Sequence, residues 1–254
     1  MSTTFTNGMS PLGPPVHGNG EQPHPVDSPN GRSPLPPRDR SVKKRRGADP
    51  FDAILWRLQS RQSPASGPMT IGLLGCEKRA GVTTIATNLA VRASEMQLGP
   101  VLLVETDADR SRLRKSWRLG SGPGLTELMA GDASLADCTY AGPAPGLKVI
   151  PAAAGQGGDE TLAWDTGAVD ALLAETCADY RLVLFDLPCA DQLHQTVLLA
   201  RRLEQVLLVI RAESTRSRDA QRIADRLTED GVPLSGVVLN RSRSYVPNWL
   251  KRWI

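Results

Sequence analysis

One short loop limits the folds open to this chain more than any other feature. Residues 75–84 read GCEKRAGVTT and follow the apolar run Met69–Leu74. Behind the loop, residues 83–93 carry apolar side chains at helical spacing. A buried strand, a glycine-bounded loop and a helix in this order make a phosphate-binding loop, or P-loop, whose backbone N–H groups wrap phosphate oxygens. The order of the three pieces therefore predicts an α/β fold built around a P-loop.

The loop keeps the frame of a P-loop but lacks its charge. Gly81 and Thr83 stand where a P-loop has its last glycine and its Mg²⁺-binding hydroxyl, but Val82 takes the place of the lysine beside the terminal phosphates. Losing one charge-assisted contact typically costs a few kcal/mol, which slows a reaction about a hundredfold or more. Either other cations of the loop replace the lysine, or they point to solvent. The candidate nucleotide-binding residues of the loop are Lys78, Arg79, Ala80, Gly81, Val82, Thr83 and Thr84.

Further apolar runs are typical of buried parallel strands, and helical segments such as Ser217–Leu227 lie between them. This alternation predicts a doubly wound, mainly parallel sheet with helices on both faces. The expected strands after the first are residues 101–107, 181–188, 205–211 and 236–240.

Acidic residues close two of the expected strands. Asp107 and Asp186 should meet the P-loop in one crevice, because ligands of a parallel sheet bind at the carboxyl ends of its strands. Asp186 ends an apolar strand as a Walker-B acid does, where it holds Mg²⁺ directly or through water; alternatively it caps the next turn. The candidate ligands of Mg²⁺ are Thr83, Asp107 and Asp186.

Composition divides the chain into three parts. Residues 1–48 are expected to be a disordered, Pro-rich basic segment, since the first fifty of the 254 residues hold half of the 20 prolines. Residues 49–241 are expected to form one domain, which opens with a Pro-initiated helix that packs on its own core or on a neighbouring subunit. Residues 242–254 form a basic tail with tryptophans. The first fifty residues carry the net charge of +3, so the domain is nearly neutral and a broad nucleic-acid-binding face is not expected.

The sequence favours a cytoplasmic protein. Its four cysteines show no close pairing, so neither a disulfide framework nor a zinc site is expected. No stretch approaches the roughly 20 apolar residues that cross a bilayer. The basic run 43–46 is either a solvated linker or a contact with anionic lipid, and the tail is either an interfacial helix or packs back on the domain. A peripheral position at the inner face of the plasma membrane is therefore open.

These pieces resemble the cytoplasmic kinase domain of bacterial tyrosine kinases, the capsule and exopolysaccharide proteins of the CpsD/CapB type, in the MinD/ParA class of P-loop proteins. The resemblance covers about residues 49–241 and is most specific in segments 124–135, 146–152, 179–188 and 236–241. It implies ATP and Mg²⁺ as ligands. It assigns Thr83 to Mg²⁺, Asp107 to the second acid of the Walker-A′ pair, Asp186 to Walker B and Asn240 to the adenine edge. The resulting catalytic candidates are Glu105, Asp107 and Asp186.

The chain also departs from this family. The lysine position is Val82, and the signature lysine of the MinD/ParA class falls on Glu77. Glu105 replaces the first Walker-A′ aspartate, the family's proposed base for the acceptor hydroxyl. The Tyr-rich C-terminal tail on which these kinases autophosphorylate is absent, because Tyr140, Tyr180 and Tyr245 are the chain's only tyrosines.

Three functions remain open. The first is a degenerate accessory or regulator of polysaccharide biosynthesis and export that acts by binding. The second is an active non-specific protein-tyrosine kinase or ATPase that uses Lys78, Arg79 or an arginine from a partner. The third is a ParA-like positioning ATPase. The resemblance implies a membrane partner of the polysaccharide co-polymerase or chain-length-determinant type, or another exopolysaccharide assembly component, and a homo-oligomer is also open.

Overall fold

The computed structural model describes residues 49–62, 67–107, 112–153, 164–195 and 197–242. The Pro-rich segment 1–48 and nearly all of the tail 242–254 lie outside these residues. The division of the chain into three parts therefore stays a prediction.

A seven-stranded sheet lies at the centre of the described domain, in the order β3-β4-β2-β5-β1-β6-β7. All neighbouring strands are parallel except β3 and β4. The expected doubly wound, mainly parallel α/β fold is confirmed, and each of the five expected strands is present. The strands are β1 Met69–Gly75, β2 Val101–Glu105, β3 Tyr140–Ala141, β4 Leu147–Ile150, β5 Leu182–Cys189, β6 Gln205–Arg211 and β7 Leu234–Asn240.

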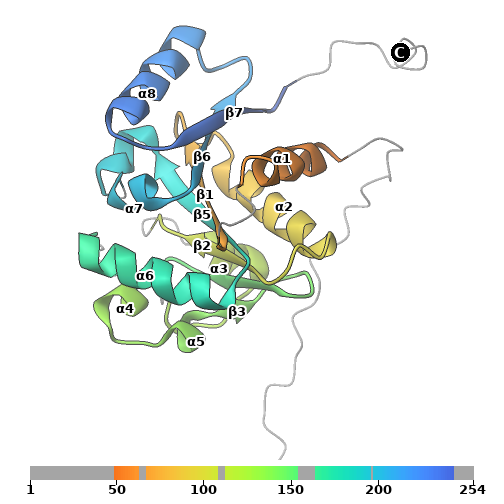
Figure 1. Cartoon of the computed structure of the whole chain (residues 1–254), viewed down its shortest axis with the longest axis vertical. Coiled ribbons are helices and arrows are strands. Elements are labelled where there is room, and N and C mark those ends of the chain that lie inside the picture. Colours follow the sequence, from red (N-terminus) through yellow and green to blue (C-terminus); the bar gives the residue numbers. More distant parts are fainter. Residues whose placement is uncertain (1–48, 63–66, 108–111, 154–163, 196, 243–254) are drawn as a thin grey trace, which may run out of the picture. The chain divides into compact units, whose positions relative to one another are not determined.

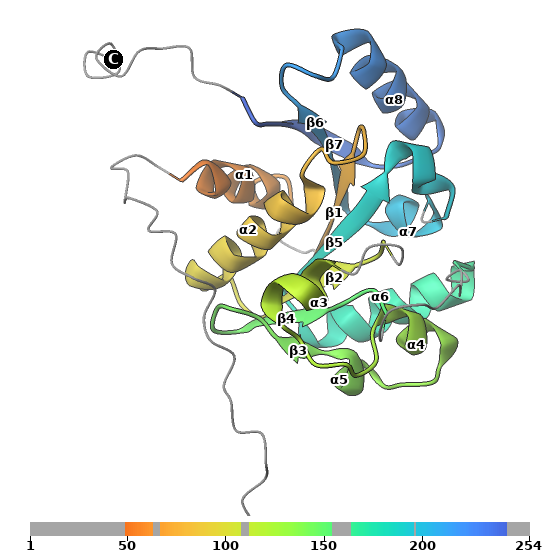
Figure 2. The same cartoon turned by 180° about the vertical axis from the view of Figure 1, so that it is seen from behind.

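Helices cover both faces of the sheet (Figures 1 and 2). One hydrophobic cluster joins one sheet face to α1 Pro50–Gln59, α2 Val82–Glu95 and α3 Arg112–Trp117. A second cluster joins the other face to α4 Leu125–Ala130, α5 Leu135–Cys138, α6 Thr166–Asp179, α7 Val197–Arg202 and α8 Ser217–Glu229. A 3-10 helix, Ala190–Gln195, follows β5.

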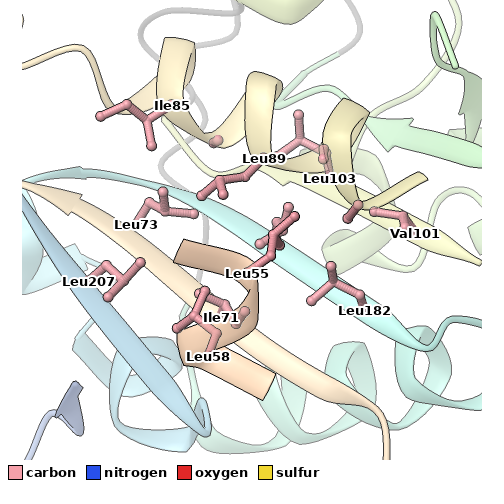
Figure 3. Close-up of a cluster of buried hydrophobic side chains, with 14 of the residues drawn as sticks. Leu55, Leu58, Ile71, Leu73, Ile85, Leu89, Val101, Leu103, Leu182 and Leu207 are labelled. Carbon is pink, nitrogen blue, oxygen red and sulfur yellow. The ribbon is translucent and has the colours of Figure 1, made fainter. Parts of the chain in front are cut away.

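The helix α1 packs on the domain's own core. Asp49 caps it by accepting a hydrogen bond from the backbone N–H of Phe51, and Pro50 occupies its first turn. Leu55 and Leu58 are buried with residues of β1 and α2, as Figure 3 shows. Asp52 forms a two-pronged ion pair with Arg92 of α2, with N···O distances of 2.5 and 3.0 Å. Of the two arrangements expected for this helix, the structure shows packing on its own core.

Two further features of the described residues bear on the sequence analysis. All four cysteines are free. None of the helices in the described ranges combines the length and the apolar character needed to span a membrane.

Candidate functional site

The P-loop connects β1 to α2 at the carboxyl edge of the sheet. Gly81 has φ of 95° and precedes the first residue of α2 without any side-chain cap, so the first N–H groups of this 14-residue helix have no capping side chain. A Cβ at Gly81 would collide with the side-chain nitrogen of Asn240. Arg79 also has positive φ, 66°, a conformation that favours glycine. The loop therefore has the backbone of a phosphate cradle.

At the position of the P-loop lysine, this chain has an apolar residue in apolar surroundings. The side chain of Val82 is half-buried and packs against the hydrophobic cluster shared by β1, α1 and α2. A Cβ at Gly75 would lie 3.0 Å from a methyl group of Val82. Lys78 and Arg79 are exposed, although both line the hollow above the loop. The residue at the centre of the cradle thus offers no charge to a phosphate.

Asp186 lies at the base of the hollow, directly beside the P-loop. It pairs with Leu73 of β1 and Glu105 of β2 in the sheet register, and its side chain is 4% exposed. Its backbone carbonyl accepts hydrogen bonds from the N–H and hydroxyl of Thr106, at 3.1 and 2.9 Å. Burial raises the pKa of Asp186 to about 7, whereas a hydrogen bond with Thr83 acts in the opposite direction. Two of the three expected Mg²⁺ ligands therefore contact each other.

Glu105 has a structural role that its sequence position did not reveal. It is 1% exposed, and its carboxylate accepts hydrogen bonds from the backbone N–H groups of Arg112, Leu113 and Ala152, at 2.6, 3.1 and 3.3 Å. These contacts join the end of β2 to the start of α3 and to the segment after β4. Burial raises the pKa of Glu105, and the three N–H donors oppose that rise. Its expected role as a base stays a prediction.

Two of the segments that carried the family resemblance, 124–135 and 146–152, contact each other. The N–H groups of Leu125 and Thr126 donate to the carbonyls of Pro151 and Ala152, at 2.8 and 2.9 Å. A Cβ at Gly124 would overlap the carbonyl oxygen of Pro151, so only glycine allows this approach. The two segments thus brace the residues that hold Glu105.

Glu77 joins the P-loop to the loop after β6. Its carboxylate accepts hydrogen bonds from the hydroxyls of Ser214 and Thr215, at 2.6 and 3.0 Å. The bond from Ser214 lowers the pKa of Glu77, which is therefore ionised at neutral pH. Since Glu77 also lines the hollow, its negative charge opposes a polyphosphate there.

Asn240, at the end of β7, binds the P-loop through its side chain. Its side-chain N–H donates to the carbonyl of Ala80 at 2.7 Å, and its side-chain oxygen accepts from the N–H of Arg241 at 2.8 Å. Contact with an adenine edge stays a prediction, because both polar atoms already bind the backbone. Thr84 is exposed on the first turn of α2 and is not among the described residues that line the hollow.

The hollow brings most of the expected site residues together and adds others. The expected members are Lys78, Arg79, Ala80, Gly81, Val82, Thr83, Glu105, Asp107 and Asp186. Sequence reasoning missed Arg112, Cys189 and Gln192, which also line the hollow. Arg112 stands in a run of alternating basic residues, so no local signal separates it from its neighbours. The convergence of the P-loop with Asp107 and Asp186 is as expected.

The residues present fit a phosphate chain with Mg²⁺ in all but two respects. The uncapped α2 N–H groups suit phosphate oxygens, and Thr83 and Asp186 offer oxygen ligands beside them. In the described residues, no group of three or more His, Cys, Asp or Glu could hold a metal ion. The two departures are the missing lysine and the negative charge of Glu77 in the hollow.

Comparison with known proteins confirms the expected resemblance to bacterial tyrosine kinases. The chain is 26% identical to the tyrosine-protein kinase Ptk of Acinetobacter johnsonii over 170 residues, 67% of its length. It is 29% identical over 175 residues, 69% of its length, to EpsB of Ralstonia nicotianae, which is assigned as a tyrosine-protein kinase. The matched part spans 23% of the length of each relative. No family model matches the sequence.

Solved structures confirm the P-loop fold. The chimerical protein CapA2B2 superposes with a TM-score of 0.68 at 22% identity, covering 79% of this chain and 88% of the other. The kinase domain of Escherichia coli tyrosine kinase ETK gives 0.64 at 20% identity, covering 78% of each chain. MinD of Pyrococcus horikoshii, solved with Mg-ADP, gives 0.55 at 22% identity, covering 73% and 76%. The fold is therefore that of the tyrosine kinase domain and of MinD.

Proposed function

We propose that this chain acts by binding, as an accessory or regulator of polysaccharide biosynthesis and export that retains the tyrosine kinase fold with weakened phosphotransfer. The observation that carries the proposal is Val82, an apolar side chain packed against the core at the position of the P-loop lysine. Phosphoryl transfer depends on positioning and on cations around the transferred group. A cradle without its central cation favours binding over chemistry.

In this function, the residues of the hollow would hold a nucleotide by its phosphates. The N–H groups at the start of α2 would bind phosphate oxygens, and Thr83 and Asp186 would hold Mg²⁺. When bound, Mg²⁺ supplies the positive charge that offsets the phosphates. Asn240 would keep the loop in shape through its bond to Ala80, and Glu77 would limit affinity through its negative charge.

We further propose a partner at the inner face of the plasma membrane, of the polysaccharide co-polymerase type. Support comes from the sequence similarity to tyrosine-protein kinases and from the retained kinase fold. In a protein of this kind, nucleotide binding in the hollow would affect the contact with the partner through the loops around the hollow.

Equilibrium titration tests the site. ATP and ADP are titrated into the full chain by calorimetry, with and without Mg²⁺, into the millimolar range. We expect Mg²⁺-dependent binding that Thr83→Ala weakens and Val82→Lys strengthens about tenfold or more, because the new ammonium would meet a phosphate. Tyrosine phosphotransfer by the wild type at the rate of the Val82→Lys variant would contradict the proposal.

One observation supports an active kinase or ATPase as a second candidate. Lys78 and Arg79 are exposed, line the hollow and carry positive charge. If they replace the lysine, Lys78→Ala and Arg79→Ala should lower ATP turnover at least tenfold. Turnover that does not change in either variant would remove this candidate.

A further inference from the structure

Arg112 brings a positive charge to the hollow from the start of α3. It is the first residue of α3, it is half-buried, and it lines the hollow with Thr83 and Asp186. None of the ion pairs found between described residues involves its guanidinium. The side chain is therefore placed to meet an anion that enters the hollow.

The backbone of Arg112 is held firmly at this place. Its N–H donates to the carboxylate of Glu105 at 2.6 Å, and the next N–H, of Leu113, donates to the same oxygen at 3.1 Å. Leu113 is buried in the core. Because the anchoring contacts use backbone atoms and Leu113, the guanidinium of Arg112 takes no part in them.

The other cations around α3 and the P-loop are less suited to this position. The guanidinium of Arg114 donates to the carbonyls of Ala153 and Gly122, at 3.0 and 2.8 Å, and lies 5.3 Å from the ring centre of Tyr140. Arg114 thus braces the loop after its own helix. Lys115 is exposed on α3 and does not line the hollow formed by described residues.

We propose that Arg112 supplies the phosphate-binding cation that Val82 cannot supply, so that the hollow binds the di- or triphosphate of a nucleotide. A guanidinium presents a planar fork of N–H donors and binds two phosphate oxygens at once. This inference rests on the proposed nucleotide site. The charge lost from the P-loop itself is thereby restored from the segment that follows β2.

Calorimetric titration of Mg-ATP, Mg-ADP and inorganic tripolyphosphate into the full chain tests the inference. We expect Arg112→Gln to weaken all three ligands about ten- to hundredfold, because a hydrogen bond to a charged group is lost. Arg112→Lys should lose less, since it keeps the charge but not the fork. Lys115→Gln, on the same helix, is the matched control and should bind like the wild type.

A double-mutant cycle separates a phosphate contact from an indirect effect. In the Val82→Lys background, Arg112→Gln should cost less affinity than in the wild type, because the new lysine supplies the charge. Thermal unfolding should place Arg112→Gln close to the wild type, since its anchoring contacts come from the backbone.

The possible failures can be told apart. If the wild type binds and Arg112→Gln binds within twofold of it, this inference is wrong and the nucleotide site stands. If only the Val82→Lys variants bind, Arg112 supplies no useful charge and the inference is again wrong. If no variant binds any of the three ligands, the nucleotide-binding part of the proposed function fails with it.

Discussion

Asp186 is a buried acid beside a proposed phosphate site, and its protonation affects the stability of the fold. Its pKa rises from an ordinary value of 3.8 to about 7 in the folded protein. Between these values the folded state binds more protons than the unfolded state, so this carboxyl stabilises the fold at low pH. Its contribution is lost as the pH rises through about 7, and it is worth up to about 4 kcal/mol.

The first prediction follows from the direction of this pKa shift. Replacing Asp186 by Asn removes the ionisable group, so the variant should gain stability relative to the wild type when the pH is raised from 5 to 8. We expect a relative gain of about 1 to 4 kcal/mol in the free energy of unfolding, measured in urea at both pH values. Asp132→Asn, at an exposed carboxyl, is the control. An equal effect of Asp186→Asn at both pH values would contradict the prediction.

The second prediction separates structure from chemistry at Glu105. Replacing Glu105 by Ala leaves two buried backbone N–H groups and one half-buried one without their acceptor, so the free energy of unfolding should fall by about 3 kcal/mol or more. Chemical denaturation measures this loss, and Glu175→Ala at an exposed site should cost less than about 0.5 kcal/mol. A Glu105→Ala variant as stable as the wild type, but deficient in phosphotransfer, would point to a purely catalytic role.

Single residues show where sequence reasoning reached its limit. Thr83, Asp107 and Asp186 could be placed together because the ends of parallel strands meet at one edge. Arg112 could not, since its position depends on the acceptor that Glu105 offers to its backbone N–H. When tertiary contacts determine where a side chain lies, the periodicity of the sequence does not reveal its position.

At the scale of elements, long apolar runs were predictable and short ones were not. The runs of β1, β2, β5, β6 and β7 stand out against polar surroundings. β3 has two residues and β4 has four, and a run that short does not separate a strand from a loop. β4 extends the sheet beside β2 and leads into Ala152, which binds Glu105, so one of the missed strands supports the site.

The third prediction concerns the docking of α1. Leu55 is fully buried against β1 and α2, so Leu55→Ala should lower the free energy of unfolding by about 2 to 5 kcal/mol and increase hydrogen exchange in α1. Trp56 is 69% exposed on the same helix, and Trp56→Ala should stay within about 0.5 kcal/mol. A loss of stability in Trp56→Ala that depends on protein concentration would instead place the outer face of α1 in a contact between copies.

At the scale of the whole molecule, the fold follows the P-loop pattern more closely than the charges of the site do. The parallel sheet, the uncapped helix α2 and the strand-end acids form the frame of a P-loop fold. The charges on that frame differ from those of the usual P-loop, since Val82 occupies the lysine position and Glu77 lines the hollow. Backbone geometry can persist when individual side chains change, because the core and not the site determines it.

The last prediction follows from the distribution of tyrosines over the chain. The hydroxyl of Tyr140 donates to the carbonyl of Pro123 at 2.8 Å, and burial raises the pKa of Tyr180, so neither described tyrosine offers a fully exposed acceptor. After incubation with Mg-ATP, mass spectrometry should find no phosphate on Tyr140 or Tyr180. The Val82→Lys variant should share this result, because a lysine in the P-loop does not expose the hydroxyl of either tyrosine. Phosphate on either residue of the folded wild type would show that these segments open far enough to serve as substrates, and would favour the active-kinase candidate.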